Sequence, residues 1–287
     1  MGLGKEPGIA QQHLVRELVH LRSVAGLDQR EIAKAVDLSQ ATVSRVERLG
    51  KLLSLPEVRA WAQACGASTE VLDRLTALTD AAWMQTQPMR DLLTDSRQLQ
   101  DEVRANEATA RTLRYYSPSL IPGLLQTPGY AEHVLRLTNF TGQGDEAAAL
   151  AGRWRRQEAL ADRSRRFDFV ITEAVLRWSP AGPDVLAAQL DRLVAVAGQD
   201  NVSLGVVMSG REPVLPLHGF TIYADRGEED PFVSVELVHT YVTASRPEDV
   251  ALYQDVFDKL RTASMTGRDV VAMTQRFASE LRIRSLH

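Results

Sequence analysis

The chain has 287 residues, of which 44% are hydrophobic, with one cysteine and a formal net charge of −4. This length predicts about two domains with a sizeable core, and one cysteine excludes an intrachain disulfide or a multi-cysteine metal site. The chain has no apolar run long enough to cross a bilayer and no apolar signal-peptide core, so we expect a cytoplasmic protein with no membrane contact. The spacing of the histidines predicts no metal site, and we expect no cofactor.

Residues 11–80 are predicted to form five helices, of which the second and third form a helix-turn-helix. Asp28, followed by Glu31, forms a capping box before a short helix. Asp37 and Leu38 interrupt the helical pattern, and Ser39 is a good N-cap for the next helix. Helices over 11–23, 56–64 and 69–78 would complete the domain.

The helix that follows Ser39 has one apolar and one polar face. Its valines, Val43 and Val46, are expected to face inward. Gln40, Ala41, Ser44 and Arg45 then lie outward near its N-terminal end, where a helix in the major groove reads base edges. This layout predicts sequence-specific binding of double-stranded DNA. The alternative is a helical hairpin that packs against a partner.

This segment resembles the Xre, or phage-repressor-like, helix-turn-helix family. The resemblance implies that Gln29 touches a phosphate, that Arg48 contacts the DNA backbone, and that Arg22 pairs with Glu47. The chain departs from the family at Asp37, where glycine is usual, and at the extra Leu49 before Gly50. The full predicted DNA-binding set is Gln29, Ser39, Gln40, Ala41, Thr42, Ser44, Arg45, Arg48 and Lys51.

The remainder of the chain is predicted to be a helical linker over 81–114 and an α+β domain over 115–287. Within the linker we expect one helix from about Met89 to Tyr115, with an apolar stripe too sparse for a long coiled coil. The α+β domain is expected to have a sheet of about four strands, with strands over 167–172, 202–208, 219–224 and 232–238. Helices are expected over 130–137, 145–162, 183–197, 247–263 and 267–283.

Residues 121–131 read IPGLLQTPGYA, in which prolines and glycines fix the backbone of an apolar segment. This run is similar to the signature of a large actinobacterial group of Xre-type regulators, the WhiJ-like regulators. The resemblance extends over residues 107–283. It implies a C-terminal domain of uncharacterised function that senses a small ligand or a small companion protein, and that is antitoxin-like in some members.

A possible ligand or partner site in this domain combines aromatic walls with a few polar groups. Its candidate residues are Tyr115, Gln126, Tyr130, Arg153, Arg156, Glu173, Trp178 and Glu236, and Phe220 and Tyr223 are further candidates for the aromatic walls. Aromatic residues of an ordinary core have the same sequence pattern. The arginine-rich stretch over 153–166 is either an anion or partner site or a helix face split between internal ion pairs and solvent.

An enzyme is the less favoured interpretation of this domain. Glu173 and Glu236 could face each other across a cleft and act as an acid and a base. The alternative, which we favour, is that they form ion pairs with arginines such as Arg153, Arg156 or Arg177. We therefore expect no enzyme, but a homodimeric transcription regulator. An antitoxin-like protein that sequesters a small companion protein, with DNA binding secondary, remains open.

Overall fold

The computed structural model describes residues 8–284 except Gly50, Asp95 and Glu228. The chain forms two compact units, Met1–Gln85 with Ala244–Arg246, and Thr86–Thr243 with Pro247–His287. None of the helices described is long and apolar enough to be a membrane span. Each unit is considered by itself below.

The first unit is helical, as predicted from the sequence. Its helices are α1 (Ile9–Val24), α2 (Gln29–Ala35), α3 (Gln40–Glu47), α4 (Leu55–Ala64) and α5 (Thr69–Trp83). Their apolar faces meet in one core that contains Leu18, Ile32 and Val43. Trp61 is fully buried there, and its indole N–H donates to the carbonyl of Leu18 at 3.1 Å, so the one polar group of that side chain is satisfied.

The second unit is built on a mixed β-sheet, which within the described residues has eight strands rather than about four. The strands are β1 (Met84–Pro88), β2 (Thr112–Ser117), β3 (Arg166–Thr172), β4 (Val202–Val207), β5 (Phe220–Ala224), β6 (Phe232–Glu236), β7 (Thr240–Ala244) and β8 (Met265–Thr266). Their order is β1-β7-β6-β5-β2-β3-β4-β8. The strands β2, β3 and β4 run parallel, and β5 continues the sheet antiparallel to β2.

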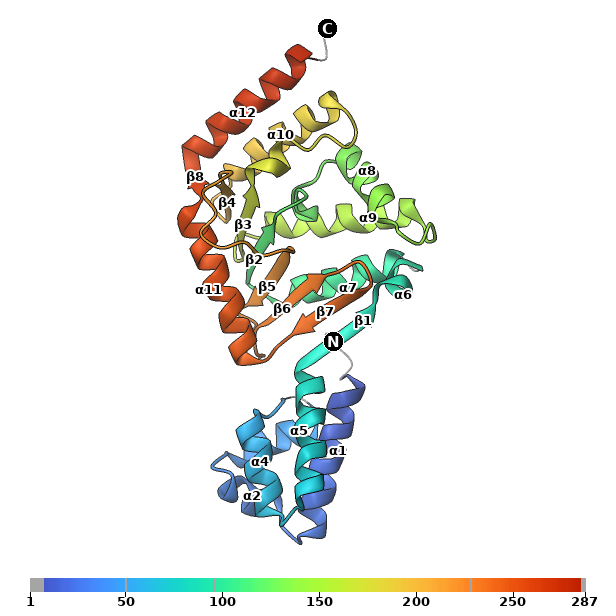
Figure 1. The fold of residues 1–287 in the computed structure, drawn as a ribbon, viewed down its shortest axis with the longest axis vertical. Coiled ribbons are helices and arrows are strands. Elements are labelled where there is room, and N and C mark those ends of the chain that lie inside the picture. The colour runs from blue at the N-terminus through green and yellow to red at the C-terminus, as the bar shows by residue number, and fades with distance from the viewer. Residues whose placement is uncertain (1–7, 50, 95, 228, 285–287) are drawn as a thin grey trace. The chain divides into compact units, whose positions relative to one another are not determined.

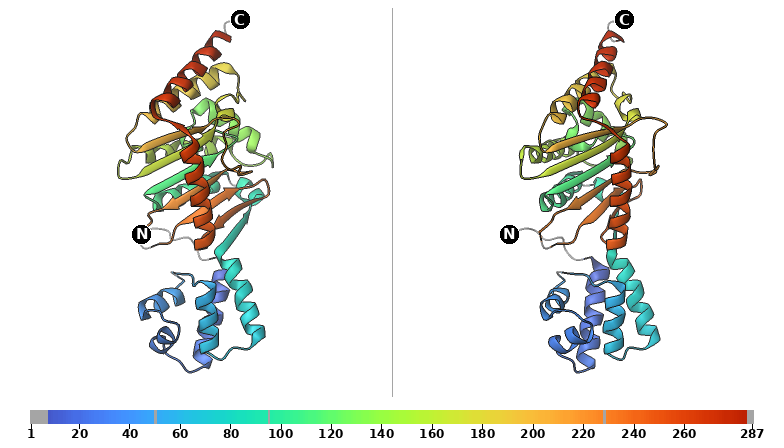
Figure 2. Two further views of the ribbon diagram at one scale, coloured as in Figure 1. Left: turned by 60° about the vertical axis from the view of Figure 1, so that its left-hand side comes forward. Right: turned by 90° about the vertical axis from the view of Figure 1, so that its left-hand side faces the viewer.

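Helices cover both faces of this sheet. On one face, α11 (Pro247–Ala263) packs Phe257 and Leu260 against Val170 of β3. On the other face, α8 (Pro128–Thr138), α10 (Pro183–Ala197) and α12 (Gly267–Arg284) pack against Phe167 and Phe169 of the same strand. Figure 1 shows α10 and α12 side by side, and Figure 2 shows α11 running along the sheet. Because β3 is buried on both faces, apolar residues fill positions 167 and 169–171, and Asp168 is a buried polar residue between them.

The segment predicted as one helix over 89–115 differs from that prediction. It contains α6 (Met89–Thr94), α7 (Ser96–Thr109) and then strand β2. The side chains of β2 alternate between the two faces, with Tyr115 packed in one core and Tyr116 in the other. The local sequence does not reveal this strand because its pairing partners, β3 and β5, come more than fifty residues later in the chain.

A buried ion pair joins α7 to α9 (Glu146–Arg156). The guanidinium of Arg156 donates twice to the carboxylate of Glu107, from Nη2 at 2.7 Å and from Nε at 3.0 Å, and its Nη1 donates to Gln100 at 2.7 Å. The hydroxyl of Tyr115 donates to the same carboxylate at 2.9 Å. Burial, together with the charge of Glu107, raises the pKa of Tyr115 well above its usual value, so the hydroxyl stays protonated and serves as a donor.

We predict that Glu107→Gln destabilises the second unit. The substitution keeps the shape of the side chain but leaves the charge of Arg156 buried without its partner, which costs about 3–5 kcal/mol of unfolding free energy. Calorimetry of the full chain measures this loss. The matched control is Glu158→Gln, an exposed glutamate two residues beyond Arg156, which should change stability by about 0.5 kcal/mol or less. Equal stability of the two variants would contradict the prediction.

Candidate nucleic-acid interface and ligand cavity

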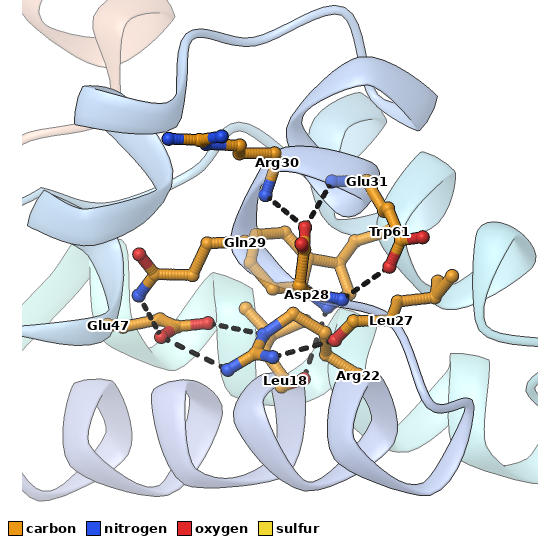
Figure 3. A network of polar contacts seen from close by, with 9 residues as sticks. All are labelled: Leu18, Arg22, Leu27, Asp28, Gln29, Arg30, Glu31, Glu47 and Trp61. Carbon is orange, nitrogen blue, oxygen red and sulfur yellow. Dashed lines mark hydrogen bonds and ion pairs between the residues drawn. The ribbon is translucent and has the colours of Figure 1, made fainter.

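The start of α2 has the capping box predicted from the sequence. The carboxylate of Asp28 accepts from the backbone N–H groups of Arg30 and Glu31 at 2.7 and 2.8 Å, and Glu31 accepts from the N–H of Asp28 at 2.7 Å (Figure 3). The N–H groups of Glu31 and Arg30 stabilise the charged carboxylate and lower the pKa of Asp28. These local hydrogen bonds fix the first turn of α2.

The turn between α2 and α3 is formed by a residue in the left-handed region. Asp37 has a φ of +55°, so it takes the conformation for which the related family uses glycine. The N–H of Leu38 donates back to Ala33 at 2.8 Å, and the hydroxyl of Ser39 accepts from the N–H of Thr42 at 3.1 Å. The departure at Asp37 therefore preserves the tight turn and the cap of α3.

An ion pair holds the end of α3 against the end of α1. The guanidinium of Arg22 donates to Glu47 at 2.6 and 3.3 Å and to the carbonyl of Leu27 at 2.8 Å (Figure 3). The pair that the family resemblance implies is thus present. The side-chain amide of Gln29 also donates to Glu47, at 2.7 Å. It belongs to this internal network, and its contact with a phosphate stays a prediction.

The outward face of α3 carries most of the predicted base-reading residues. Gln40, Ala41 and Arg45 are exposed and Ser44 is half-buried, whereas Val43 and Val46 are buried as expected. Arg48, at the C-cap of α3, is also exposed. We call Gln40, Ala41, Ser44, Arg45 and Arg48 the α3 ridge.

Besides Gln29, three predicted contacts lie outside this ridge: Ser39, Thr42 and Lys51. The side chain of Thr42 is buried, with its hydroxyl 2.9 Å from that of Ser39, so these two residues form the cap rather than an outward pair. Lys51 is half-buried. The extra residue Leu49 has a φ of +63°, and its carbonyl accepts from the side-chain amide of Gln11 at 3.0 Å. Gly50 lies outside the described residues.

In the second unit, a cavity of about 280 Å³ lies between the loop over 117–123 and strands β2, β5 and β6. Of the predicted site residues, the lining contains Tyr115, Gln126, Arg153, Arg156 and Glu236. Phe220 and Tyr223, the two further aromatic candidates, also line it. Ser234 lines it as well and was not predicted, because its alternation along β6 predicts only a strand.

The other three predicted residues lie elsewhere in the unit. Tyr130 and Trp178 contact each other edge to face, with ring centroids 6.0 Å apart, as part of the apolar packing around α8. Glu173 is 3.1 Å from Arg177 and accepts from the N–H of Ser209 at 3.3 Å. Partial burial raises its pKa, but the Ser209 N–H and Arg177 outweigh that effect, so the pKa of Glu173 is lowered.

The positions of Glu173 and Glu236 test whether these two carboxylates could face each other across one cleft. Glu236 lines the cavity, whereas Glu173 does not, and Glu173 has a cation of its own in Arg177. The structure therefore does not bring the two carboxylates together around that cavity.

The two cavity arginines differ in how fully their charges are matched. Arg156 is neutralised by Glu107. Arg153, one turn earlier on α9, donates from Nη1 to Gln126 at 2.8 Å, and its Nε has no acceptor. Burial, followed by the like charge of Arg156, lowers the pKa of Arg153 to about 10, and the charge of Glu236 only partly offsets this. Arg153 is thus a cation at the cavity wall without an anion in contact.

Internal contacts also account for other arginines in the basic stretch over 153–166. Arg163 donates to Asn201 at 3.0 Å, and Arg165 donates to the carbonyls of Ala110 and Glu107. Arg166 lies 3.6 Å from Asp168. The stretch is therefore largely engaged within the unit rather than forming one continuous basic surface.

Fold and site together define a protein with a helix-turn-helix unit followed by an α+β unit. A model described as a helix-turn-helix domain matches residues 13–75. The chain belongs to the family described as domain of unknown function (DUF5753), whose model matches residues 100–276.

Comparison with solved structures gives a weak likeness to the archaeal chromatin protein TrmBL2, whose structure is described as showing a novel mode of DNA binding. The identity is 12%, the match covers 89% of this chain and 93% of that chain, and the TM-score is 0.34. A score this low does not show a common fold, and nothing below rests on it. A comparison with curated proteins found no match.

We predict that Glu47→Ala destabilises the first unit by about 1–3 kcal/mol, because the half-buried guanidinium of Arg22 loses its charged acceptor. Chemical denaturation followed by tryptophan fluorescence measures the change, since Trp61 reports on this core. The control is Glu17→Ala, which removes the exposed ion pair with Arg74 and should cost about 1 kcal/mol or less. A larger loss for the control than for Glu47→Ala would refute the assignment of Glu47 as the anchor.

Proposed function

We propose that this protein is a sequence-specific DNA-binding transcription regulator. The observation that carries the proposal is the α3 ridge, an exposed polar surface on a helix whose start is capped and whose end is anchored by Arg22 and Glu47. Gln and Arg side chains present the paired donors and acceptors that distinguish adenine and guanine in the major groove. The match to a helix-turn-helix domain supports the same function.

We further propose that the regulator acts as a homodimer on a palindromic operator. A single helix of this size contacts few base pairs, and helix-turn-helix proteins generally double the contact by placing two recognition helices about one helical turn apart. The modest net charge of −4 supports this, because a chain without a general positive charge gains little from non-specific attraction to phosphates.

The second unit is proposed to sense a signal and to change the affinity for DNA, as the resemblance to WhiJ-like regulators implies. Its cavity of about 280 Å³ supports a small ligand. Coupling of this kind typically amounts to about 1–3 kcal/mol between the two sites. The proposal includes no catalytic role for the unit, in keeping with the separate surroundings of Glu173 and Glu236.

A small companion protein is the second candidate partner. It is favoured by exposed apolar side chains near the end of α8 and after β6, where Leu137, Phe140 and Val238 are 56%, 61% and 70% exposed. Co-expression with the product of the neighbouring gene tests it. Phe140→Ser should abolish co-purification, whereas Leu252→Ser, at an equally exposed position on α11, should not. Equal effects of the two variants would count against this candidate.

We predict that Arg45→Ala weakens binding to the operator by roughly 1–3 kcal/mol and relaxes the sequence preference at one base pair. The reason is that the variant loses a bidentate base contact. Genomic footprinting identifies the operator, and fluorescence anisotropy on operator and scrambled duplexes measures both effects. An unchanged footprint and affinity would remove Arg45 from the base-reading residues.

Arg48→Ala should behave differently, because a phosphate contact carries no sequence information. We predict weaker binding to all sequences and a salt dependence whose slope is reduced by about 1. Arg74→Ala serves as the control for both variants, since Arg74 lies on α5 and pairs with Glu17 of α1. A loss with Arg74→Ala equal to that with Arg48→Ala would show that the effect is general electrostatics rather than a contact of the α3 ridge.

A further inference from the structure

A second cavity of about 240 Å³ adjoins the first in the same unit. The two cavities share three lining residues, Thr138, Arg153 and Glu236. Arg153 and Glu236 carry opposite charges, so one cation and one anion lie at the junction of the two cavities. The arrangement suits a ligand that extends from one cavity into the other.

Among the side chains that the structure describes, neither Arg153 nor Glu236 has a counter-ion within 4.0 Å. The hydrogen bond that the structure gives the guanidinium of Arg153 goes to an uncharged amide, that of Gln126, and its Nε has no acceptor. Glu236 is exposed at the end of β6, and no ion pair joins these two described side chains within 4.0 Å. By contrast, Arg156 on the same helix is fully engaged with Glu107 and Gln100. Glu146, which also lines the second cavity, lies 3.9 Å from Arg136. Arg153 and Glu236 are therefore the charges at the junction that a ligand can match.

The second cavity is mainly apolar beyond this junction. Its walls include Leu99, Leu135, Phe140 and Leu237. A ligand that fits must therefore combine a charged group at the junction with an apolar group beyond it, as small-molecule sites generally do when a few polar groups fix the orientation.

We propose that the adjoining cavities bind an α-amino acid with an apolar side chain, whose carboxylate pairs with Arg153 and whose ammonium pairs with Glu236. The apolar side chain lies in the second cavity. This inference rests on the ligand-binding part of the proposed function and names the class of the ligand.

Charge balance selects a zwitterion over a simple acid or a simple amine. A carboxylate alone would pair with Arg153 but lie beside the uncompensated charge of Glu236. An amine alone would pair with Glu236 but lie beside the uncompensated charge of Arg153. A ligand bound at the junction would displace water from both side chains, so an unmatched charge there would be costly. A zwitterion matches both charges at once, with charge-assisted hydrogen bonds on each side.

Isothermal titration of the full chain with three ligands of one shape tests the proposal without any mutation. L-Phenylalanine has both charged groups, 3-phenylpropanoate lacks the ammonium, and 2-phenylethylamine lacks the carboxylate. We expect L-phenylalanine to bind roughly tenfold or more tightly than either analogue. The same series built on L-leucine (4-methylpentanoate and 3-methylbutylamine) covers an aliphatic side chain. Absence of zwitterion preference in both series overturns the proposal.

Two variants assign the charges to their residues. Arg153→Gln should remove the advantage of the amino acid over its amine, and Glu236→Gln should remove its advantage over its acid. The neighbouring Arg155→Gln and the exposed Glu158→Gln line neither cavity and should leave binding unchanged. A uniform loss in all four variants, or no loss in the first two, contradicts the assignment. Melting curves without ligand establish that each variant is folded.

Measurements of operator binding separate the test of the ligand site from the test of DNA binding. Operator binding is measured by anisotropy with and without L-phenylalanine or L-leucine. If the amino acid binds but leaves the DNA affinity unchanged, the site stands and the sensing role is overturned. If neither amino acid binds while the operator is still recognised, the ligand class is overturned and the DNA-binding regulator stands.

Discussion

The buried pair of Arg156 and Glu107 is the interaction on which the second unit depends. Two charges taken out of water are tolerated only because each is matched by the other, with Gln100 and Tyr115 completing the hydrogen bonds. The contacts tie α7 to α9 and both helices to the central strand β2. They also decide the chemistry of the cavity. Because Glu107 is committed to Arg156, Arg153 reaches the cavity wall without a described anion in contact, which is the basis for the anionic group of the proposed ligand.

The first unit also contains an arginine–carboxylate pair, and this pair orients helix α3. Arg22 and Glu47 join the end of α1 to the end of α3, and Gln29 adds the start of α2 to the same carboxylate. A helix of eight residues such as α3 is too short to be stable by itself, so its orientation depends on such contacts and on the Ser39 cap. In both units an arginine–carboxylate pair thus holds in place the helix that carries the proposed binding residues.

The sequence predicts well those elements that are determined by interactions between residues close together in the chain. Asp28, Ser39 and the turn at Asp37 act within a few residues, and β3 and β4 are apolar enough to be recognised alone. The sequence predicts helix where strand β2 lies, because the place of β2 between β3 and β5 is fixed by distant partners. Likewise, Gln100 and Glu107 have the pattern of a solvent-facing helix, and only the approach of Arg156 makes their burial favourable. The α3 ridge was predictable because the cap, the turn and the helix that carry it depend on local interactions. The cavity, which is assembled from several distant segments, could be predicted only in part.

The path of the chain gives the proposed sensing a physical route. Glu236 ends β6, and the next strand, β7, leads directly into Ala244–Arg246, which cluster with the first unit. There the N–H of Ser245 donates to the carbonyl of Trp83 at 3.1 Å, and Arg246 forms an ion pair with Asp80, so this short segment is held at the end of α5. In the proposed sensing, a ligand at Glu236 would contact a hairpin whose far strand continues into that segment. The chain itself therefore connects the proposed ligand site to the first unit, and this connection is the element whose arrangement both sites would have to bias.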